Sequence, residues 1–127
     1  MPTNLKSSAP HIAGASTWND DLVDWGEHLD PIDGRSHNKG RLLWKGDEDG
    51  LPEAGVWEST PGSWRLVLPR DELVHFVSGR ATYSSDDGEV IEVTPGTVVH
   101  FREGWSGTVA VHETIRSVYM LSWGPKT

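Results

Sequence analysis

Histidine and carboxylate side chains are the groups of this sequence that could carry acid–base or metal chemistry. The chain has six histidines and no cysteine, which excludes disulfides and thiolate sites. His11, His28 and His37 lie in polar, turn-rich sequence, where we expect them to be solvated. His100 is the histidine that could face an interior, although its strand parity is ambiguous. No serine lies in a nucleophile-elbow context, so a nucleophilic triad is not indicated.

The charge of the chain argues against two classes of partner. The formal net charge is −8, and an acidic surface repels both nucleic acid and anionic lipid. No apolar run approaches the roughly 20 residues of a membrane helix, and the first ten residues lack the apolar core of a signal peptide. We therefore expect a cytoplasmic protein that binds neither nucleic acid nor membrane.

Tryptophan is unusually frequent in this chain. Two interpretations are open for each indole: it fills a core or an interface, or it lines a pocket for a ring or a cation. The seven tryptophans are Trp18, Trp25, Trp44, Trp57, Trp64, Trp105 and Trp123.

The first 40 residues are expected to contain a tail, one short helix and a loop. Residues 1–15 are polar and rich in small residues. A hydroxyl cap, acids in the first turn and a closing glycine predict a helix over residues 16–26, with Trp18, Leu22 and Trp25 on one stripe. Turn signals then predict a loop over residues 27–41.

Residues 41–127 are expected to form one all-β domain, because 127 residues suit a single domain. Short runs alternate with turns, no helix separates them, and Asp87-Gly88 is a hairpin signal. The pattern predicts a sandwich or closed barrel and excludes a parallel α/β sheet. The predicted strands are Arg41–Lys45, Gly55–Glu58, Ser63–Leu68, Glu72–Val77, Arg80–Ser84, Glu89–Val93, Thr97–Phe101, Gly107–His112 and Ile115–Trp123.

Two segments resemble the motifs of the cupin superfamily. Glu72-Leu-Val-His-Phe-Val-Ser-Gly79 has the glutamate-to-glycine spacing that ends the first motif. The segment from Gly96 to Gly107 keeps the glycines of the second motif, with Arg102 in place of its proline and Gly107 in place of its histidine. The resemblance implies a single cupin jelly-roll barrel.

A closer resemblance is to the small cupins of the ureidoglycine aminohydrolase and ethanolamine-utilisation type, many without assigned activity. It rests on Gly55-Val-Trp-Glu-Ser-Thr-Pro-Gly62 and on Gly104-Trp-Ser-Gly-Thr-Val-Ala-Val-His-Glu113. The chain departs from that family at Ser117, where a lysine is usual, and at Ser78, where a glutamate is common. An activity that depends on either group should not be carried over.

A cupin metal site has two histidines before the motif-one glutamate and one at the end of motif two. Residues 62–72 contain no histidine, and Gly107 occupies the last position. The resemblance therefore implies no metal and no other cofactor, because one carboxylate does not hold a transition metal. An unconventional set of Glu72, His100 and Glu113 stays open as the alternative.

The resemblance also suggests where a site lies. It places Glu72 in the barrel interior, on the face of Val74 and Phe76 and opposite His75, and a buried carboxylate requires a partner such as Arg65 or Arg70. The candidate catalytic residues are Glu72, His100 and Glu113. The candidate ligand-binding residues are Arg65, Trp57, Glu58, Trp105 and Tyr119.

Three functions are compatible with such an interior. The first is a cupin that binds a small polar metabolite, with metal-independent acid–base catalysis of a lyase, isomerase, dehydratase or hydrolase step. The second is a non-enzymatic small-molecule sensor or accessory module, and the third is a metal-dependent aminohydrolase. We also expect a homodimer, because an open cupin sandwich leaves edge strands that must be covered or paired.

Overall fold

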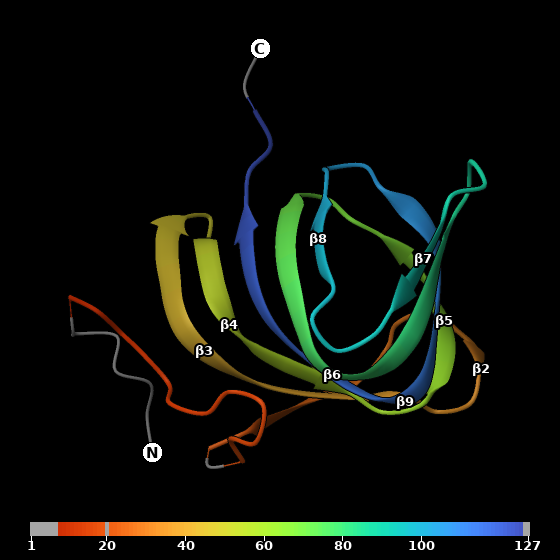
Figure 1. Cartoon of the computed structure of the whole chain (residues 1–127). Helices are drawn as coiled ribbons and strands as arrows, with labels where there is room; N and C mark the ends of the chain where they lie inside the picture. Colours follow the sequence, from red (N-terminus) through yellow and green to blue (C-terminus); the bar gives the residue numbers. More distant parts are fainter. Residues whose placement is uncertain (1–7, 20, 126–127) are drawn as a thin grey trace.

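A single antiparallel sheet curls into an open barrel in the computed structural model, which describes residues 8–19 and 21–125 (Figure 1). The described residues contain nine strands and no helix, which agrees with the all-β cupin jelly roll predicted from the sequence. The strands are β1 (Val23–Glu27), β2 (Pro31–Asp33), β3 (His37–Glu48), β4 (Leu51–Ser59), β5 (Gly62–Val67), β6 (Asp71–Ser85), β7 (Val90–Val93), β8 (Val98–Phe101) and β9 (Ser106–Ser122).

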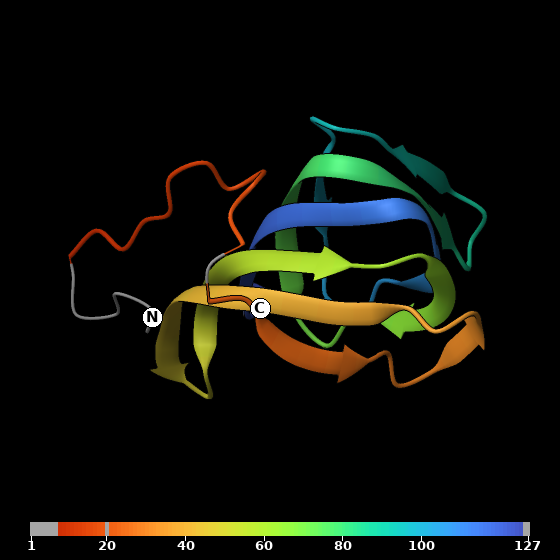
Figure 2. The ribbon, with the colours of Figure 1, turned by 90° about the horizontal axis from the view of Figure 1, so that it is seen from below.

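The barrel is organised around its two longest strands, β6 and β9. They pair with one another along most of their length, from Asp71↔Ser122 to Ser85↔Gly107. The first half of β9 also pairs with β5 and its second half with β4, while β6 also pairs with β7 and β8. Seen from below, β3, β4, β9 and β6 lie side by side as one curved layer (Figure 2). The register shifts of β6 against β9 between Phe76 and Ala81 lie midway along this bending ribbon.

Strand alternation determines which side chains fill the barrel. On β6, Val74 and Phe76 are buried whereas Leu73 and His75 are exposed, so successive residues face opposite sides of the sheet. The same rule on β9 buries Val109 and Val111. The core also contains rings, among which Tyr83 lies between Phe76 and Phe101, with ring centroids 5.7 and 5.2 Å away.

The helix predicted over residues 16–26 was wrong. Val23–Glu27 form strand β1, which pairs with the start of β3, from Val23↔Gly40 to Glu27↔His37. A helix of this length is marginal on its own, whereas as a strand the segment pairs with the backbone of β3. Gly26, read as the closing glycine of the helix, instead adopts a φ of 85° beside an irregularity in this pairing.

The predicted loop over residues 27–41 was also wrong in part, because Pro31–Asp33 form β2 and β3 begins at His37. β3 therefore crosses the boundary expected between residues 40 and 41. Of the predicted N-terminal tail, residues 1–7 lie outside the described residues. No helix within the described ranges is long and apolar enough to cross a membrane.

The segment before β1 packs on the outer face of its own sheet. The Arg116 guanidinium, 5% exposed, donates to the backbone carbonyl of Trp18 and to Asn19 Oδ1 at 2.8 Å. The same guanidinium is 2.6 Å from Glu58 Oε1. Arg41 Cζ lies 4.9 Å from the centroid of the Trp18 ring. These contacts tie the N-terminal segment to β3, β4 and β9.

Candidate ligand-binding cavity

The inside of the curled sheet holds a cavity of about 320 Å³, within the usual range for small-molecule sites. It has a polar part with two carboxylates and an arginine, and an aromatic part that includes residues from the N-terminal strands. Its walls comprise Trp25, His28, Asn38, Glu53, Trp57, Trp64, Leu66, Leu68, Arg70, Glu72, Tyr83, Phe101, Tyr119 and Leu121.

Two carboxylates enter the cavity from neighbouring strands. The pairing register runs from Glu53 on β4 through Leu121 on β9 to Glu72 on β6, and Glu72 also pairs with Phe101 on β8. Residues directly opposite one another on antiparallel strands face the same side of the sheet. Glu53 and Glu72 are therefore two strands apart in one inward-facing row.

Glu72 lies in this row without a direct partner. Among the described residues, no side chain forms a hydrogen bond or an ion pair within 4.0 Å with its carboxyl group. Burial raises the pKa of Glu72 from 4.5 to about 7; the Arg70 charge opposes this shift and the Glu53 charge adds to it. Near neutral pH the carboxyl group is therefore present in both protonation states.

The ion pair expected for Glu72 is not formed. The Arg65 side chain is partly exposed and binds Asp86 with both terminal nitrogens. Arg65 follows the inward-facing Trp64 on β5, so strand alternation turns its side chain to the outer side of the sheet. Its partner on β9, Thr108, likewise precedes the buried Val109. Arg70 lies in the turn before β6 and acts on Glu72 through its charge, without an ion pair.

Arg70 also has an unsatisfied group. Its Nε is buried and has no hydrogen-bond partner among the described residues. The accessible surface of this nitrogen is too small for a molecule in the cavity to reach it. The Arg70 side chain nevertheless lines the cavity and forms no hydrogen bond or ion pair with any described residue, so its charge lacks a partner.

Glu53, in contrast, has partners. The Tyr119 hydroxyl donates to Glu53 Oε2 at 2.7 Å, and Lys45 Nζ is 4.0 Å from Glu53 Oε1. Burial and this bond raise the pKa of Tyr119, and burial does the same for Tyr83. Both phenols are therefore neutral around Glu72 at physiological pH.

The aromatic part of the cavity is built from stacked rings. His28 lies on Trp64, with centroids 3.4 Å apart and an interplanar angle of 9°, and Trp57 meets both rings edge-on at 6.4 Å. Burial lowers the pKa of His28 to about 4, so its ring is neutral at pH 7. His28 Nε2 is 3.0 Å from Ser59 Oγ, which fixes the ring orientation.

Trp25 reaches the cavity because Gly40 makes room for its ring. A Cβ at position 40 would lie 2.1 Å from the Trp25 ring and 2.6 Å from the Val56 carbonyl oxygen. The ring thus lies directly against the β3 backbone, which a side chain at position 40 would prevent.

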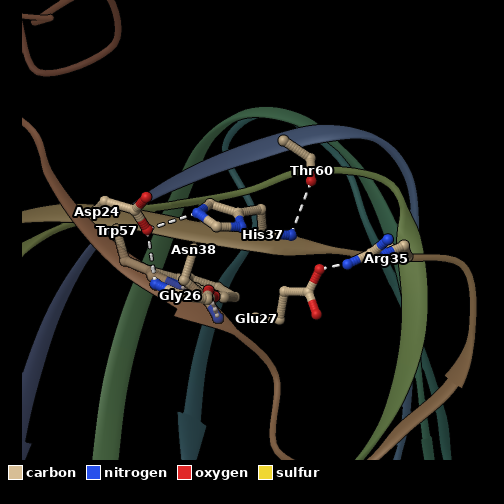
Figure 3. Close-up of polar contacts among 8 residues, drawn as sticks. All are labelled: Asp24, Gly26, Glu27, Arg35, His37, Asn38, Trp57 and Thr60. Atoms are coloured by element: carbon tan, nitrogen blue, oxygen red, sulfur yellow. Dashed lines mark hydrogen bonds and ion pairs between the residues drawn. The ribbon is translucent and has the colours of Figure 1, made fainter.

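Polar contacts hold β1 in place beside the cavity (Figure 3). Asp24 Oδ1 accepts the Gly26 N–H at 2.8 Å and lies 2.5 Å from His37 Nε2. The Gly26 N–H and then His37 lower the pKa of Asp24. Trp57 Nε1 donates to Asn38 Oδ1 at 2.7 Å, and Asn38 Nδ2 donates to the Gly26 carbonyl oxygen at 3.1 Å. These hydrogen bonds link β4, β3 and β1, and both Trp57 and Asn38 line the cavity.

Nearby contacts at the end of this hairpin include Arg35 and Thr60. Arg35 Nε is 3.0 Å from Glu27 Oε2, and the His37 N–H donates to Thr60 Oγ1 at 2.8 Å.

The structure brings only some of the predicted site residues together. Glu72, Trp57 and Tyr119 all line the cavity. Trp105 packs against the core, 5.1 Å from Phe101 and 6.2 Å from Tyr83 between ring centroids, but it is not on the cavity wall.

The other predicted residues lie on outer surfaces. His100 pairs with the exposed Leu73, so its side chain is 56% exposed and lies 3.3 Å from Asp71 Oδ2. Glu113 is exposed and lies 2.7 Å from Arg80 Nε. Glu58 contacts Arg116 under the N-terminal segment. Strand parity explains His100 and Glu58, which are out of phase with the inward row. Glu113 has the parity of the buried Val111 and Ile115, but it lies among the register shifts of β6 against β9, where its side chain is exposed.

Residues that sequence reasoning missed complete the cavity. Glu53 alternates with Gly55 and Trp57 on β4, a signal that was hidden because the predicted strand began at residue 55. Trp25, His28 and Asn38 could not be placed because their segment was predicted to be helix and loop.

The donor set does not fit a metal ion. Within residues 8–19 and 21–125, no three histidine or carboxylate side chains lie close enough to hold one. The unconventional set left open by the sequence is not brought together, because Glu72 lines the cavity whereas His100 and Glu113 are exposed. This sequence also has no histidine at the positions where the family usually has metal ligands: residues 62–72 contain none, and position 107 is glycine.

The fold and the inward glutamate define a cupin. The family model of the EutQ-like cupin domain matches residues 46–119, and the chain belongs to this family. No curated protein matches the chain. The family match begins after Trp25, His28 and Asn38, so these cavity residues come from a part of the chain that it does not cover.

Solved structures share the fold. A DUF861-family protein of unknown function from Pseudomonas syringae pv. tomato is similar with a TM-score of 0.71 at 21% identity, over 80% of this chain and 44% of that one. A putative ethanolamine utilization protein, EutQ, from Salmonella typhimurium has a TM-score of 0.59 at 17% identity, over 70% and 72%. Ectoine synthase from P. lautus has a TM-score of 0.59 at 19% identity, over 76% and 71%. The chain thus spans less than half of the Pseudomonas protein.

Proposed function

We propose that this cupin binds a small polar metabolite in its barrel cavity and that Glu72 exchanges a proton with the bound molecule without a metal. The observation that carries the proposal is Glu72 itself, an unpaired carboxyl group on the wall of a 320 Å³ cavity. A carboxyl group without an ion-pair partner destabilises a barrel interior. Such groups, with their shifted pKa values, occur preferentially at functional sites.

The pKa of Glu72 suits proton transfer. At about 7, it gives comparable amounts of acid and base near neutral pH, which is the condition for efficient general acid–base catalysis. Glu53 and Tyr119 line the same part of the cavity, where their hydrogen bond fixes the Glu53 carboxylate. A lyase, isomerase, dehydratase or hydrolase step can use such a group as its acid or base once the substrate is positioned beside it.

A non-enzymatic sensor or accessory module is the second candidate. It is supported by exposed apolar side chains on the outer face of the sheet, where a partner protein would bind: Leu73, Val98 and Met120 are 50%, 60% and 46% exposed. Such a module would bind the same ligand without converting it.

The third hypothesis, a metal-dependent aminohydrolase of the ureidoglycine aminohydrolase type, has no support in the donor set. The carboxylates of Glu53 and Glu72 lack a histidine beside them, and two carboxylates do not complete a transition-metal site.

Thermal-shift screening of a metabolite library against wild type and Glu72→Gln tests the proposal. A ligand at 100 times its dissociation constant adds about 2.7 kcal/mol to stability, which is a clear shift for a chain of this size. Glu113→Gln, the same change on the outer face, is the matched control. We expect hits that shift wild type and the control alike but lose conversion, affinity or both in Glu72→Gln.

Two outcomes separate the hypotheses. Hits that bind through Glu72 without being converted identify a sensor. Hits that Glu72→Gln both binds and converts as well as wild type does, or no hits at all, contradict the proposed role of this carboxyl group.

A further inference from the structure

The cavity contains two unpaired groups of opposite charge. Neither the Glu72 carboxyl group nor the Arg70 guanidinium forms a hydrogen bond or an ion pair with any described residue. They are near enough for the Arg70 charge to act on Glu72, but no ion pair within 4.0 Å joins them. Two such groups in a side-chain-filled barrel would ordinarily pair with each other. Their separation leaves one acceptor and one donor for a bound molecule.

The balance of charge around them favours a ligand with a cation as well as an anion. Two carboxylates, Glu53 and Glu72, face the cavity, whereas Arg70 is the one cation among its lining residues as the structure describes them. A ligand with a carboxylate alone would satisfy Arg70 but would bring a third negative group near Glu53 and Glu72. A ligand with an amine alone would leave the Arg70 guanidinium without an anionic partner.

We propose that the cavity takes a small zwitterion, an amino-acid-like molecule whose ammonium group lies against Glu72 and whose carboxylate accepts from Arg70. This inference names the ligand class of the site and rests on the proposed function. The carboxylate of the ligand receives a charge-assisted hydrogen bond from the Arg70 guanidinium, and the ammonium group gives Glu72 the partner that it lacks.

The aromatic part of the cavity complements the body of such a molecule. The rings of Trp25, Trp57, Trp64 and the neutral His28 provide apolar surface and π faces without adding charge. The carbon skeleton of the zwitterion therefore lies against uncharged rings, while both of its charged ends remain in the polar part.

The zwitterion should bind with a characteristic pH dependence. The charged or titratable groups that face Glu72 are Glu53 on β4, Arg70 before β6, and the neutral phenols of Tyr83 and Tyr119. The ammonium group binds the ionised form of Glu72. With a pKa of about 7, the ionised fraction, and with it the affinity, rises about 30-fold between pH 5.5 and 8.

Isothermal titration calorimetry with a matched series tests the inference. The probes are glycine, β-alanine, 4-aminobutyrate and 6-aminohexanoate, each compared with the carboxylic acid and the amine of the same length. We expect one length to bind best, at least about tenfold more tightly than its matched acid and its matched amine. Glu72→Gln should remove the advantage over the acid, and Arg70→Gln the advantage over the amine.

The Arg80–Glu113 pair on the surface provides controls, because Arg80→Gln and Glu113→Gln make the same changes outside the cavity. Arg70→Lys keeps the charge but not the planar guanidinium donors, so it should weaken binding even if Arg70→Gln fails to fold. An acid or an amine that binds as tightly as its amino acid overturns the zwitterion while leaving a Glu72-dependent metabolite site intact. Absence of binding by every probe also overturns the zwitterion, and the proposed function is then decided separately by the library screen with wild type and Glu72→Gln.

Discussion

Replacing Glu72 by glutamine should make the protein more stable at high pH, because the substitution removes a carboxyl group that must ionise in a buried position. The pKa of this group rises from 4.5 to about 7 on folding. An acid whose pKa is raised in the folded state contributes stability that is fully present below the unfolded pKa and is lost as the pH rises through the folded pKa. Wild type should therefore lose stability between about pH 4.5 and 7, and the glutamine variant should not lose this contribution.

The magnitude follows from the shift. One pKa unit corresponds to about 1.4 kcal/mol, and the two pKa values give a loss of about 2.5 kcal/mol between pH 5 and pH 8. Glu72 is only partly buried, because the cavity admits solvent, so we expect a measured effect of about 1–2.5 kcal/mol. The sign is opposite to that for a buried ion pair, where losing the carboxylate would leave an arginine unpaired and destabilise the fold.

Urea unfolding of both proteins at pH 5 and pH 8 measures this difference, since all other titrating groups are common to the two. Glu113→Gln is the control, and its difference from wild type should stay the same at both pH values. A Glu72→Gln difference that also stays the same would refute the reasoning, because Glu72 would then titrate as a solvated side chain. A variant less stable at pH 8 would indicate a direct ion pair with Arg70.

Three further outcomes are expected. The protein should be a homodimer, because Trp44, Leu73, Val98 and Met120 are exposed on the outer face of the sheet; light scattering at micromolar concentration should give the mass of two 14.0 kDa chains, and a monomer mass would reject the dimer. Elemental analysis of protein purified without a histidine tag should find no stoichiometric metal, and one equivalent of zinc, manganese, iron or nickel would contradict the account of the donor set. Arg116→Ala should destabilise the fold by about 3 kcal/mol and expose the segment before β1 to protease, because it removes the buried cation that holds this segment; unchanged cleavage would show that other contacts hold it.

The barrel could be predicted from the sequence because the alternation of apolar and polar residues along each strand is a local, periodic signal. On β6, the alternation of Glu72, Val74 and Phe76 against Leu73 and His75 is visible in the residues, and the cupin motifs add the direction of the glutamate. The parity of His100 was not visible, because β8 is a strand of four residues whose phase is set by its pairing with Leu73.

The N-terminal part was mispredicted for a similar reason. Residues 16–26 contain a good helix start and stop, but the conformation of Val23–Glu27 is decided by the edge of β3, whose partner residues lie 10 to 17 positions further along the chain. The cavity wall depends on that distant pairing, because Trp25 enters only where Gly40 admits its ring. The separation of Glu72 from Arg70 is likewise a matter of register and turn geometry, which spacing alone does not specify.

The most direct test of the account is the titration of the Glu72 side-chain carboxyl carbon by ¹³C NMR, assigned by comparison with Glu72→Gln. We expect a midpoint near pH 7 that moves downward when a zwitterionic ligand places its ammonium group beside the carboxylate. A midpoint at the ordinary value of a solvated glutamate, unmoved by any ligand that binds, would contradict it.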